Sequence, residues 1–409
     1  MKYYGSVAAL EVNNILVLNI FPENYLDFYL KQNIWDNNIS ISQIPNHYLE
    51  INLKDTLHTK ITKKYPSILN LNQWFKLELV HNDKGNAIYY ESILAEENSN
   101  INLISLEFID GRTSIGRQLH KVFSLNNLSD ASEEAISNTI KRKNYKFLAI
   151  YNVGQGNCTA LCDSHGKPQL YFDLGGGYKS DSKTYPKNLE LCNCDSPPII
   201  LSHWHGDHWK SVRKFPTFES SVWIVPKQKL TADALKTATE IYKKGTLLIW
   251  PTNISKIAFN SGEILRCTGK SQNDSGIALI FKQKIASIEK ETLLPGDSKY
   301  KYIPYLSNKK FDNLVVTHHG GVSPSQIPLP KNTSHNAHVY SYGLMNTHGH
   351  PFPQTIQLHS QNGWLNGMDT VNGHVGIGIC CEYHSNKHVK DHNTRCNTVI
   401  TQGVPLIVD

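Results

Sequence analysis

Short runs in which apolar and polar residues alternate dominate the first part of the chain. The clearest runs are 15–21, 74–80, 87–93 and 101–109, and they are rich in β-branched and aromatic residues. A period of two is expected of a strand that buries one face, and turn residues such as those at 82–85 separate the runs. Residues 1–128 are therefore predicted to form a β-rich N-terminal domain that also contains some helix.

A helical pattern follows over residues 129–144. Serine and acidic side chains stand at its start, and Lys141, Arg142 and Lys143 stand at its end. This order of charges matches the polarity of a helix dipole. The segment is predicted to be a helical linker between two domains.

From Tyr145 onward, strand-like runs alternate with longer segments. These runs are 147–153, 169–173, 198–202, 222–226, 278–282 and 314–317. The amphipathic segment 231–244 has the composition of a helix. Alternation of strands with helices predicts a layered α/β domain over residues 145–409. Fifteen of the 19 histidines lie in this half, so the candidate chemistry is there too.

Length and charge narrow the class of protein only a little. A chain of 409 residues is too long for one ordinary core, which agrees with two domains. The net charge of +6 permits an anionic substrate but is too small to indicate a nucleic-acid binder by itself. Residues 1–21 lack the features of a signal peptide, and no apolar run approaches the roughly 20 residues that cross a bilayer. We expect a cytoplasmic protein that does not contact the membrane.

The eight cysteines lack the paired CxxC spacing of a structural zinc site, which predicts reduced thiols that fill the core. One other pattern has ligand spacing, because four potential ligands recur every four residues: His384, His388, His392 and Cys396. The stretch is rich in Asn, Lys and Ser and lies between two strand-like runs. A solvated hairpin loop is favoured over a metal site there.

The densest cluster of polar chemistry follows the short buried-strand pattern at 197–202. Four potential metal ligands stand directly after it: His203, His205, Asp207 and His208. Residues two apart in an extended loop face the same side, so His203 and His205 can share one metal ion. Gly206 then lets the chain turn and present Asp207 and His208 to a second ion. Nitrogen and oxygen donors suit Zn²⁺ and also Mn²⁺ or Fe²⁺, so we expect two divalent metal ions, with Zn²⁺ favoured and Mn²⁺ possible.

Two tryptophans, Trp204 and Trp209, flank these ligands. Aromatic side chains beside a site can stack on a base, as they do in proteins that bind single-stranded nucleic acid. Packing of the loop is the favoured role.

The HxHxDH signature at 203–208 resembles the metallo-β-lactamase superfamily. Further motifs of this half occur in the matching order: VGQGN at 153–157, YFDLGG at 171–176, LLPGD at 293–297, VVTHHGG at 315–321 and GHP at 349–351. They look like elements of a branch that includes the metallo-β-lactamase-like domain of the DNA-uptake protein ComEC and phosphorylcholine esterase. The resemblance covers the chain from about Phe147 onward. It implies an αββα sandwich, preceded here by the additional β-rich N-terminal domain, and a metal-dependent hydrolase.

The resemblance also implies the remaining ligands. Asp297 is implied as the carboxylate that bridges both metal ions. The superfamily's usual third histidine is absent, because residues 209–296 contain no histidine, so the later ligands are expected from His318 or His319 and from His350.

Alternatives remain among these later residues. His318 follows the strand-like run directly and is the favoured ligand, whereas His319 is a candidate catalytic residue that contacts a substrate phosphate or protonates the leaving group, or a brace. His348 competes with His350. Asp173 is expected to accept the ring N–H of a ligand histidine and so to orient it.

Three functions fit these patterns. The first is a phosphodiesterase or nuclease that acts on DNA, RNA or another phosphodiester through a metal-activated hydroxide, with Asp207 orienting that hydroxide. The second is a hydrolase of a carboxyl substrate such as a lactone, a thioester or a β-lactam, and the missing middle histidine argues against it. The third is a partner-binding component of a DNA-handling or defence system with a gated metal site, in which residues 1–145 contact a protein partner.

Overall fold

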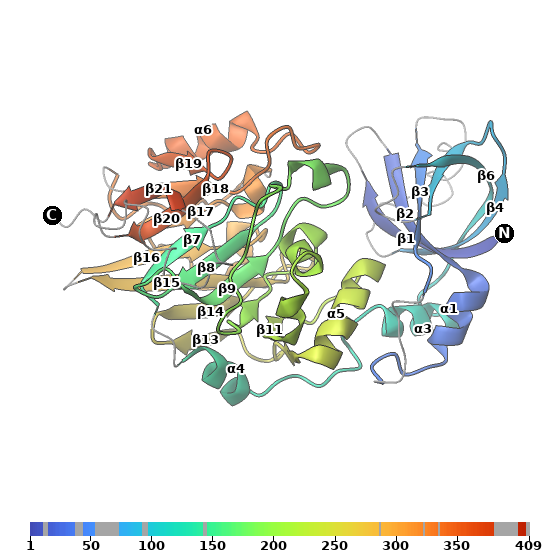
Figure 1. The fold of residues 1–409 in the computed structure, drawn as a ribbon, viewed down its shortest axis with the longest axis horizontal. Coiled ribbons are helices and arrows are strands. Elements are labelled where there is room, and N and C mark those ends of the chain that lie inside the picture. Colours follow the sequence, from blue (N-terminus) through green and yellow to red (C-terminus); the bar gives the residue numbers. More distant parts are fainter. Residues whose placement is uncertain are drawn as a thin grey trace. The chain divides into compact units, whose positions relative to one another are not determined.

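The computed structural model describes the whole chain except residues 11–14, 37–43, 54–72, 92–96, 142–144, 286–287, 322–323, 334–335, 380–399 and 406–409. The candidate ligands between His384 and Cys396 therefore lie outside the described residues. Contacts divide the chain into two units (Figure 1). One comprises Met1–Leu128 and Lys229–Lys243, and the other comprises Ser129–Gln228 and Lys244–Asp409.

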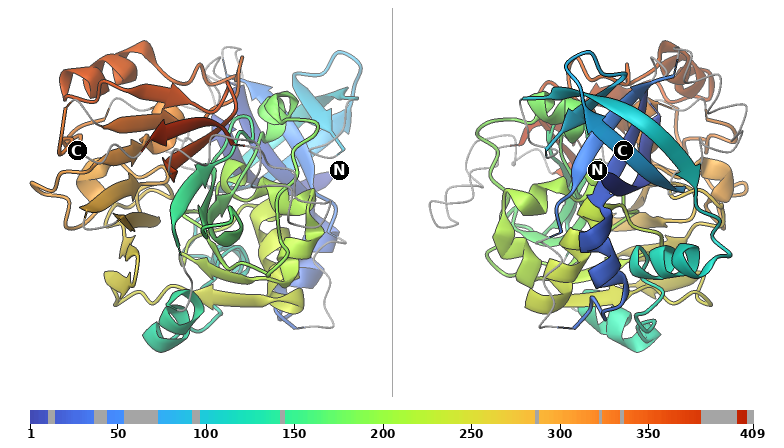
Figure 2. Two further views of the ribbon diagram at one scale, coloured as in Figure 1. Left: turned by 60° about the vertical axis from the view of Figure 1, so that its left-hand side comes forward. Right: turned by 90° about the vertical axis from the view of Figure 1, so that its right-hand side faces the viewer.

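The first unit contains a closed barrel, drawn in blue and cyan in the right-hand view of Figure 2. Its strands are β1 (Lys2–Leu10), β2 (Ile15–Pro22), β3 (His47–Asn52), β4 (Trp74–His81), β5 (Ala87–Tyr90) and β6 (Ser99–Phe108). Every neighbouring pair is antiparallel, and the pairing of β1 with β4 closes the barrel. Leu16, Leu18 and Ile20 alternate along β2 and are completely buried in the barrel core.

Helices α1 (Glu23–Leu30), α3 (Ser114–Val122) and α5 (Ala232–Lys244) accompany this barrel. Although α5 is remote from the barrel strands in sequence, its side chains contact other residues of the first unit. The Lys236 ammonium donates to the carbonyl of Ile44 over 2.9 Å, and the rings of Tyr242 and Trp35 lie 5.5 Å apart. An amphipathic helix is stabilised mainly by packing of its apolar face, which explains why α5 groups with the barrel.

In the described part of the second unit, two sheets are present (Figure 1). The eight-stranded sheet has the order β12 (Thr246–Ile249), β11 (Val222–Val225), β10 (Ile199–Ile200), β9 (Pro168–Leu174), β8 (Cys158–Cys162), β7 (Phe147–Ile150), β20 (His374–Ile379) and β21 (Ile400–Pro405). The seven-stranded sheet has the order β13 (Lys256–Phe259), β14 (Gly262–Arg266), β15 (Ile277–Ile285), β16 (Ile288–Leu294), β17 (Asn313–Val315), β18 (Ala337–Tyr340) and β19 (Gly367–Asp369).

Helical segments complete this unit. The α-helices are α4 (Glu133–Ile140) and α6 (Pro353–Gln361), and the short 3₁₀ helices are η2 (Lys179–Thr184), η3 (Gly206–His208), η4 (Lys210–Arg213), η5 (Pro216–Ser220), η6 (Tyr300–Tyr302) and η7 (Thr317–Gly320). Among the described residues, none of the helices combines the length and the apolar character needed to cross a bilayer.

Alternation along β15 shows how the two sheets pack. Ile277, Leu279 and Phe281 join a core that contains buried side chains of both sheets, whereas Ala278 and Ile280 join a separate core on the other face. A shift of one residue would exchange these faces, and burying each large side chain contributes about 2 kcal/mol, so the pattern determines the register. A side chain of α6 packs against this second core, on the outer face of the seven-stranded sheet. The two packed sheets and this helix confirm the predicted α/β class with a sandwich of two sheets.

Parallel pairing places several strand ends together. β9 pairs in parallel with β10 in one sheet, and β16, β17 and β18 are parallel in the other. Segments that leave the carboxyl ends of parallel strands emerge at one edge of a sheet, where α/β proteins commonly bind ligands.

Candidate metal centre

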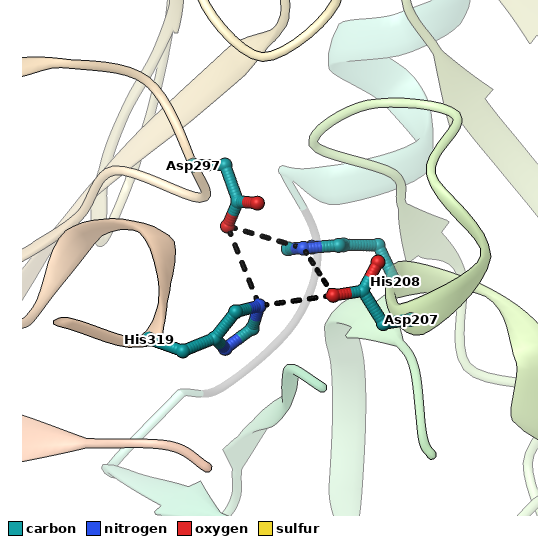
Figure 3. A group of neighbouring side chains, drawn as sticks. All are labelled: Asp207, His208, Asp297 and His319. Carbon is teal, nitrogen blue, oxygen red and sulfur yellow. Dashed lines mark hydrogen bonds and ion pairs between the residues drawn. The ribbon is translucent and has the colours of Figure 1, made fainter. Parts of the chain in front are cut away.

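The predicted site residues leave the carboxyl ends of five strands. Asp173 lies near the end of β9, and the segment 203–208 follows β10. Asp297 follows β16, the pair at 318–319 follows β17, and His350 lies beyond β18. Figure 3 shows four of these side chains pointing toward one another: Asp207, His208, Asp297 and His319.

Asp297 lies at the centre of this arrangement and is buried. Its Oδ1 atom lies 3.1 Å from Nε2 of His208 and 3.6 Å from Nε2 of His319. Its Oδ2 atom lies 3.6 Å from Nε2 of His203 and 3.4 Å from Nδ1 of His318. Each carboxylate oxygen therefore faces a different set of imidazoles.

The donors form two groups that share Asp297. We call Asp207, His208, Asp297 and His319 the two-carboxylate group, and His203, His205 and Asp297 the two-histidine group. Within each group the donor atoms lie within 4.8 Å of one another. His203 and His205 lie side by side, with ring centroids 4.6 Å apart, as expected for ligands two residues apart.

Gly206 has a different structural role from the one expected. It has no positive φ, so the turn does not depend on a left-handed backbone there. A β carbon at this position would lie 2.6 Å from the ring of Tyr178. Glycine is required because the Tyr178 ring packs directly on the backbone of the ligand segment.

The donor atoms fit divalent cations. Nε2 of His203, Nε2 of His208 and Oδ1 of Asp297 are buried and form no hydrogen bond within the described residues, which is costly unless an ion satisfies them. Two ligand atoms of a tetrahedral zinc ion lie about 3.4 Å apart, and the ion pairs around Asp297 span 3.1 to 3.6 Å. No lysine or arginine among the described residues pairs with Asp207 or Asp297, so cations are the natural countercharge.

Asp173 orients His208 from behind. It is completely buried, and its Oδ2 atom lies 2.7 Å from Nδ1 of His208. The backbone N–H of Ser202 and the amide of Asn157 also donate to this carboxylate, over 2.6 and 3.0 Å. A carboxylate that accepts the Nδ1 proton fixes the orientation of the ring, so that Nε2 of His208 is directed toward Asp297 and is the atom that would bind a cation.

A left-handed turn brings both adjacent histidines to the centre. His318 has φ 51° and ψ 41°, and His319 has φ 55° and ψ 17°. Each left-handed residue with a β carbon costs about 1 to 2 kcal/mol, and hydrogen bonds from Thr317 to the Ser298 carbonyl and from His318 to the Gly296 carbonyl hold the turn. In an extended strand one of the two rings would point away from Asp297.

The two histidines have different partners. Nδ1 of His319 lies 2.7 Å from the carbonyl of Ser341 and donates to it, which leaves Nε2 free to face Asp207 at 3.1 Å. Nδ1 of His318 lies 2.9 Å from the Asn273 amide as well as near Asp297. His319 therefore joins the two-carboxylate group, and His318 lies beside the two-histidine group without being one of its three members.

His350 lies next to the groups and belongs to neither. Its ring stacks on that of His319 with the centroids 6.2 Å apart, and the Gln155 amide lies 3.3 Å from its Nδ1 atom. Because the Gln155 carbonyl oxygen accepts from the Gly343 N–H, the amide nitrogen donates to Nδ1 of His350. The proton of the neutral ring is then on Nε2. The competing His348 is exposed and lies 3.4 Å from the Asp181 carboxylate.

Burial and charge shift the pKa values in opposite directions across the site. Burial lowers the pKa of His205 to about 4, and burial together with the neighbouring His319 and His318 rings lowers the pKa of His350 to about 3. Burial also opposes the charge on His208, but the surrounding carboxylates, that of Asp297 first, outweigh it and raise the pKa of this ring. The two histidines of the two-histidine group are thus neutral in the folded chain, because burial lowers the pKa of His203 as well, whereas the two-carboxylate group attracts positive charge.

Trp204 and Trp209 pack inside the protein. Both are buried, and their indole N–H groups donate to the carbonyls of Pro226 and Trp204. They have the packing role, and base stacking is not available to them.

Several residues that shape the centre were not identified from the sequence. Ser202 donates its hydroxyl to Asp173, and Asn273 and Ser341 contact the two adjacent histidines. Ser202 stands directly before His203, so the sequence alone places it next to the ligand segment. Asn273 and the Ser341 carbonyl have no spacing signal, because they reach the centre only through the three-dimensional fold.

Comparisons with known proteins give distant structural matches. No family model matches the sequence, and no curated protein matches it. A subclass B3 metallo-β-lactamase, MEM-A1, from a soil metagenome library is 10% identical, with 45% of this chain and 83% of that chain covered and a TM-score of 0.27. The metallo-β-lactamase GOB-18 from Elizabethkingia meningoseptica is 14% identical, with 54% and 93% covered and a TM-score of 0.27. A long form RNase Z from yeast is 10% identical, with 74% and 46% covered and a TM-score of 0.27.

Proposed function

We propose that this protein is a metal-dependent phosphodiesterase that uses two divalent cations, with zinc favoured. The observation that carries the proposal is Asp297, which presents one carboxylate oxygen to each of two groups of buried donors. A shared carboxylate suits two cations about 4 Å apart, a spacing typical of two-metal hydrolases of phosphate esters.

The geometry supports a specific assignment of ligands. His203 and His205 would hold one cation together with Oδ2 of Asp297, and His318 lies close enough to complete that side. Asp207, His208 and His319 would hold the other, together with Oδ1 of Asp297. His319 is proposed here as a ligand rather than as a proton donor, because its Nε2 atom lies 3.1 and 3.6 Å from oxygens of Asp207 and Asp297, as ligand atoms of one cation would.

Two side chains beside the cations would contribute to the reaction. When bound, the cations would lower the pKa of a water molecule toward neutrality and polarise the phosphoryl group. Asp207, the most exposed of the donor carboxylates, would accept a hydrogen bond from that water and orient it. His350 would donate a hydrogen bond from its Nε2–H group to an oxygen of the substrate, because its Nδ1 atom already accepts from Gln155.

Positive charge near the ligand segment favours a phosphodiester over a neutral carboxyl substrate. The Tyr178 ring covers Gly206, and the ammonium groups of Lys179 and Lys210 lie 5.5 and 5.6 Å from that ring. Cations beside a cleft attract anionic substrates and raise their local concentration. The motifs shared with the ComEC-like branch and the missing middle histidine favour the same substrate class.

The test is turnover by the full chain loaded with Zn²⁺ or Mn²⁺. Bis-p-nitrophenyl phosphate, single-stranded DNA, double-stranded DNA and RNA are the phosphodiester substrates, and nitrocefin and an acyl lactone are the carboxyl substrates. We expect hydrolysis of at least one phosphodiester and little turnover of the carboxyl substrates. If the loaded protein cleaves only the carboxyl substrates, or cleaves nothing, the proposal is wrong.

A further inference from the structure

We propose that the second unit carries a separate binding site for a small organic anion that includes a planar ring. The site is a cavity of about 620 Å³, here called the Tyr300 cavity, and it is lined by Tyr300, Lys301, 303–310 and 326–329. Sites for small molecules commonly measure about 300 to 1,000 Å³. Tyr300, Ile303 and Ile327 belong to the core on the outer face of the seven-stranded sheet, whereas the metal centre lies at the strand ends.

The charge of the cavity is one-sided. Lys301, Lys309 and Lys310 line it, and no aspartate or glutamate is among the described residues around it. Lys309 already pairs with Glu291 over 3.0 Å. Within the described residues Lys310 has no ion pair, and the Lys301 ammonium lies 4.9 Å from the ring centroid of Tyr302 without a carboxylate partner. Two exposed ammonium groups at the rim therefore lack a countercharge, which an anionic ligand would supply.

Part of the lining is apolar. Ile303, Ile327 and Pro328 are buried and line the cavity. Tyr305 is 57% exposed, yet its hydroxyl lies 2.9 Å from that of Ser255 and the Lys256 ammonium lies 5.2 Å from its ring centroid. An aromatic ring that is both exposed and held in place is a platform on which a planar ring can stack.

The backbone around the cavity is strained where polar side chains meet the rim. Tyr305, Asn308 and Gln326 have φ values of 63°, 62° and 59°, which residues with a β carbon rarely adopt. Such outliers concentrate at ligand sites, where the surrounding structure maintains them. The amides of Asn308 and Gln326 add neutral hydrogen-bonding groups beside the lysines. Together these features match a ligand with a ring at one end and a phosphate or carboxylate at the other.

Isothermal titration calorimetry of the full chain with 5′-AMP as the probe tests the proposal. We expect AMP to bind to the wild type, and the double variant Lys301→Ala/Lys310→Ala to bind it at least tenfold more weakly. Lys187→Ala/Lys284→Ala removes the same charge from exposed positions outside the cavity and is expected to change the dissociation constant less than twofold. Adenosine alone and inorganic phosphate alone should each bind at least tenfold more weakly than AMP, because each offers only half of the recognised chemistry.

Asp207→Asn separates this site from the metal centre. The variant is expected to bind AMP as tightly as the wild type even if it has lost hydrolytic activity, so the proposed function and this inference can fail independently. The inference is overturned if AMP does not bind, if both double variants weaken binding equally, or if Asp207→Asn abolishes it. Binding of a DNA oligonucleotide through Lys301 and Lys310 without binding of AMP would also overturn it, because the cavity would then be part of a nucleic-acid surface.

Discussion

The two donor groups on either side of Asp297 differ in charge and in support. In the two-carboxylate group, Asp207 and Asp297 face His208 and His319, and the buried Asp173 orients one of these rings from behind. In the two-histidine group, His203 and His205 share only one carboxylate. The first side combines more negative charge with a braced ligand, so it is expected to bind its cation more tightly.

The difference extends to the backbone. His205 has an extended backbone that any residue can adopt, with φ −77° and ψ 147°, whereas His319 depends on a left-handed turn. The two-carboxylate group therefore contains a member whose backbone geometry costs energy to maintain, although His318 of the same turn lies beside the two-histidine group. A strained backbone persists only where surrounding contacts hold it in place. Here the contacts are the hydrogen bond from the Thr317 hydroxyl to the Ser298 carbonyl and the hydrogen bond from His319 to the Ser341 carbonyl.

Asp297→Asn should have the largest effect, because it removes the one ligand that both groups share. We expect loss of both cations, and a fall in turnover of about 10³-fold or more if the cations supply several kcal/mol of transition-state stabilisation. Metal analysis and bis-p-nitrophenyl phosphate turnover measure this. Asp195→Asn, at a surface ion pair with Lys167, is the control and should retain both. Full metal content and activity in Asp297→Asn would show that Asp297 is not the shared ligand of two donor groups.

Asp207→Asn and His205→Ala should separate the two groups. Each variant is expected to retain about one cation, Asp207→Asn on the two-histidine side and His205→Ala on the two-carboxylate side. If the two-carboxylate side binds its cation more tightly, the ion remaining in His205→Ala should resist a chelator longer than the ion remaining in Asp207→Asn. Equal resistance in the two variants would contradict the comparison.

The sequence predicted one side of the centre better than the other, for physical reasons. Alternation in an extended segment is enough to place His203 and His205 together, and the period-two pattern of β2 and β15 is enough to predict buried faces. By the same alternation only one of His318 and His319 should face the centre. Both do so because of the left-handed turn, and Gly320 is the one residue in the sequence that hints at this turn. The contacts of Asn273 and the grouping of α5 with the barrel depend on long-range packing, which local pattern does not record.

Asp173→Asn should weaken the two-carboxylate side more than the two-histidine side, because Asp173 contacts the His208 ring directly but reaches the His203 ring only through the Ser202 hydroxyl. The asparagine can still accept a hydrogen bond but carries no charge to hold the His208 ring in one tautomer, so cation affinity on that side should fall about 10- to 100-fold. Titration with Zn²⁺ against a competing chelator would show one site weakened much more than the other. Equal weakening of both sites by Asp173→Asn would show that the effect is a general loss of structure.

His374→Asn should have the smallest effect of these substitutions. It changes how the free energy of unfolding depends on pH and leaves both donor groups unaltered. Burial lowers the pKa of the His374 ring to about 4, and its Nδ1 atom accepts a hydrogen bond from the backbone N–H of Asn152 over 2.9 Å. The unfolded chain takes up this proton below about pH 6.5, whereas the folded chain resists until about pH 4. The ring therefore costs no stability above pH 6.5, and the free energy of unfolding falls as the pH drops through this window. We expect His374→Asn to reduce that fall by on the order of 1 kcal/mol. Urea unfolding of EDTA-treated wild type and variant at pH 7, 6 and 5 measures the difference without a contribution from metal release. Parallel losses of stability in the two proteins would contradict the assignment of His374 as a neutral, hydrogen-bonded ring.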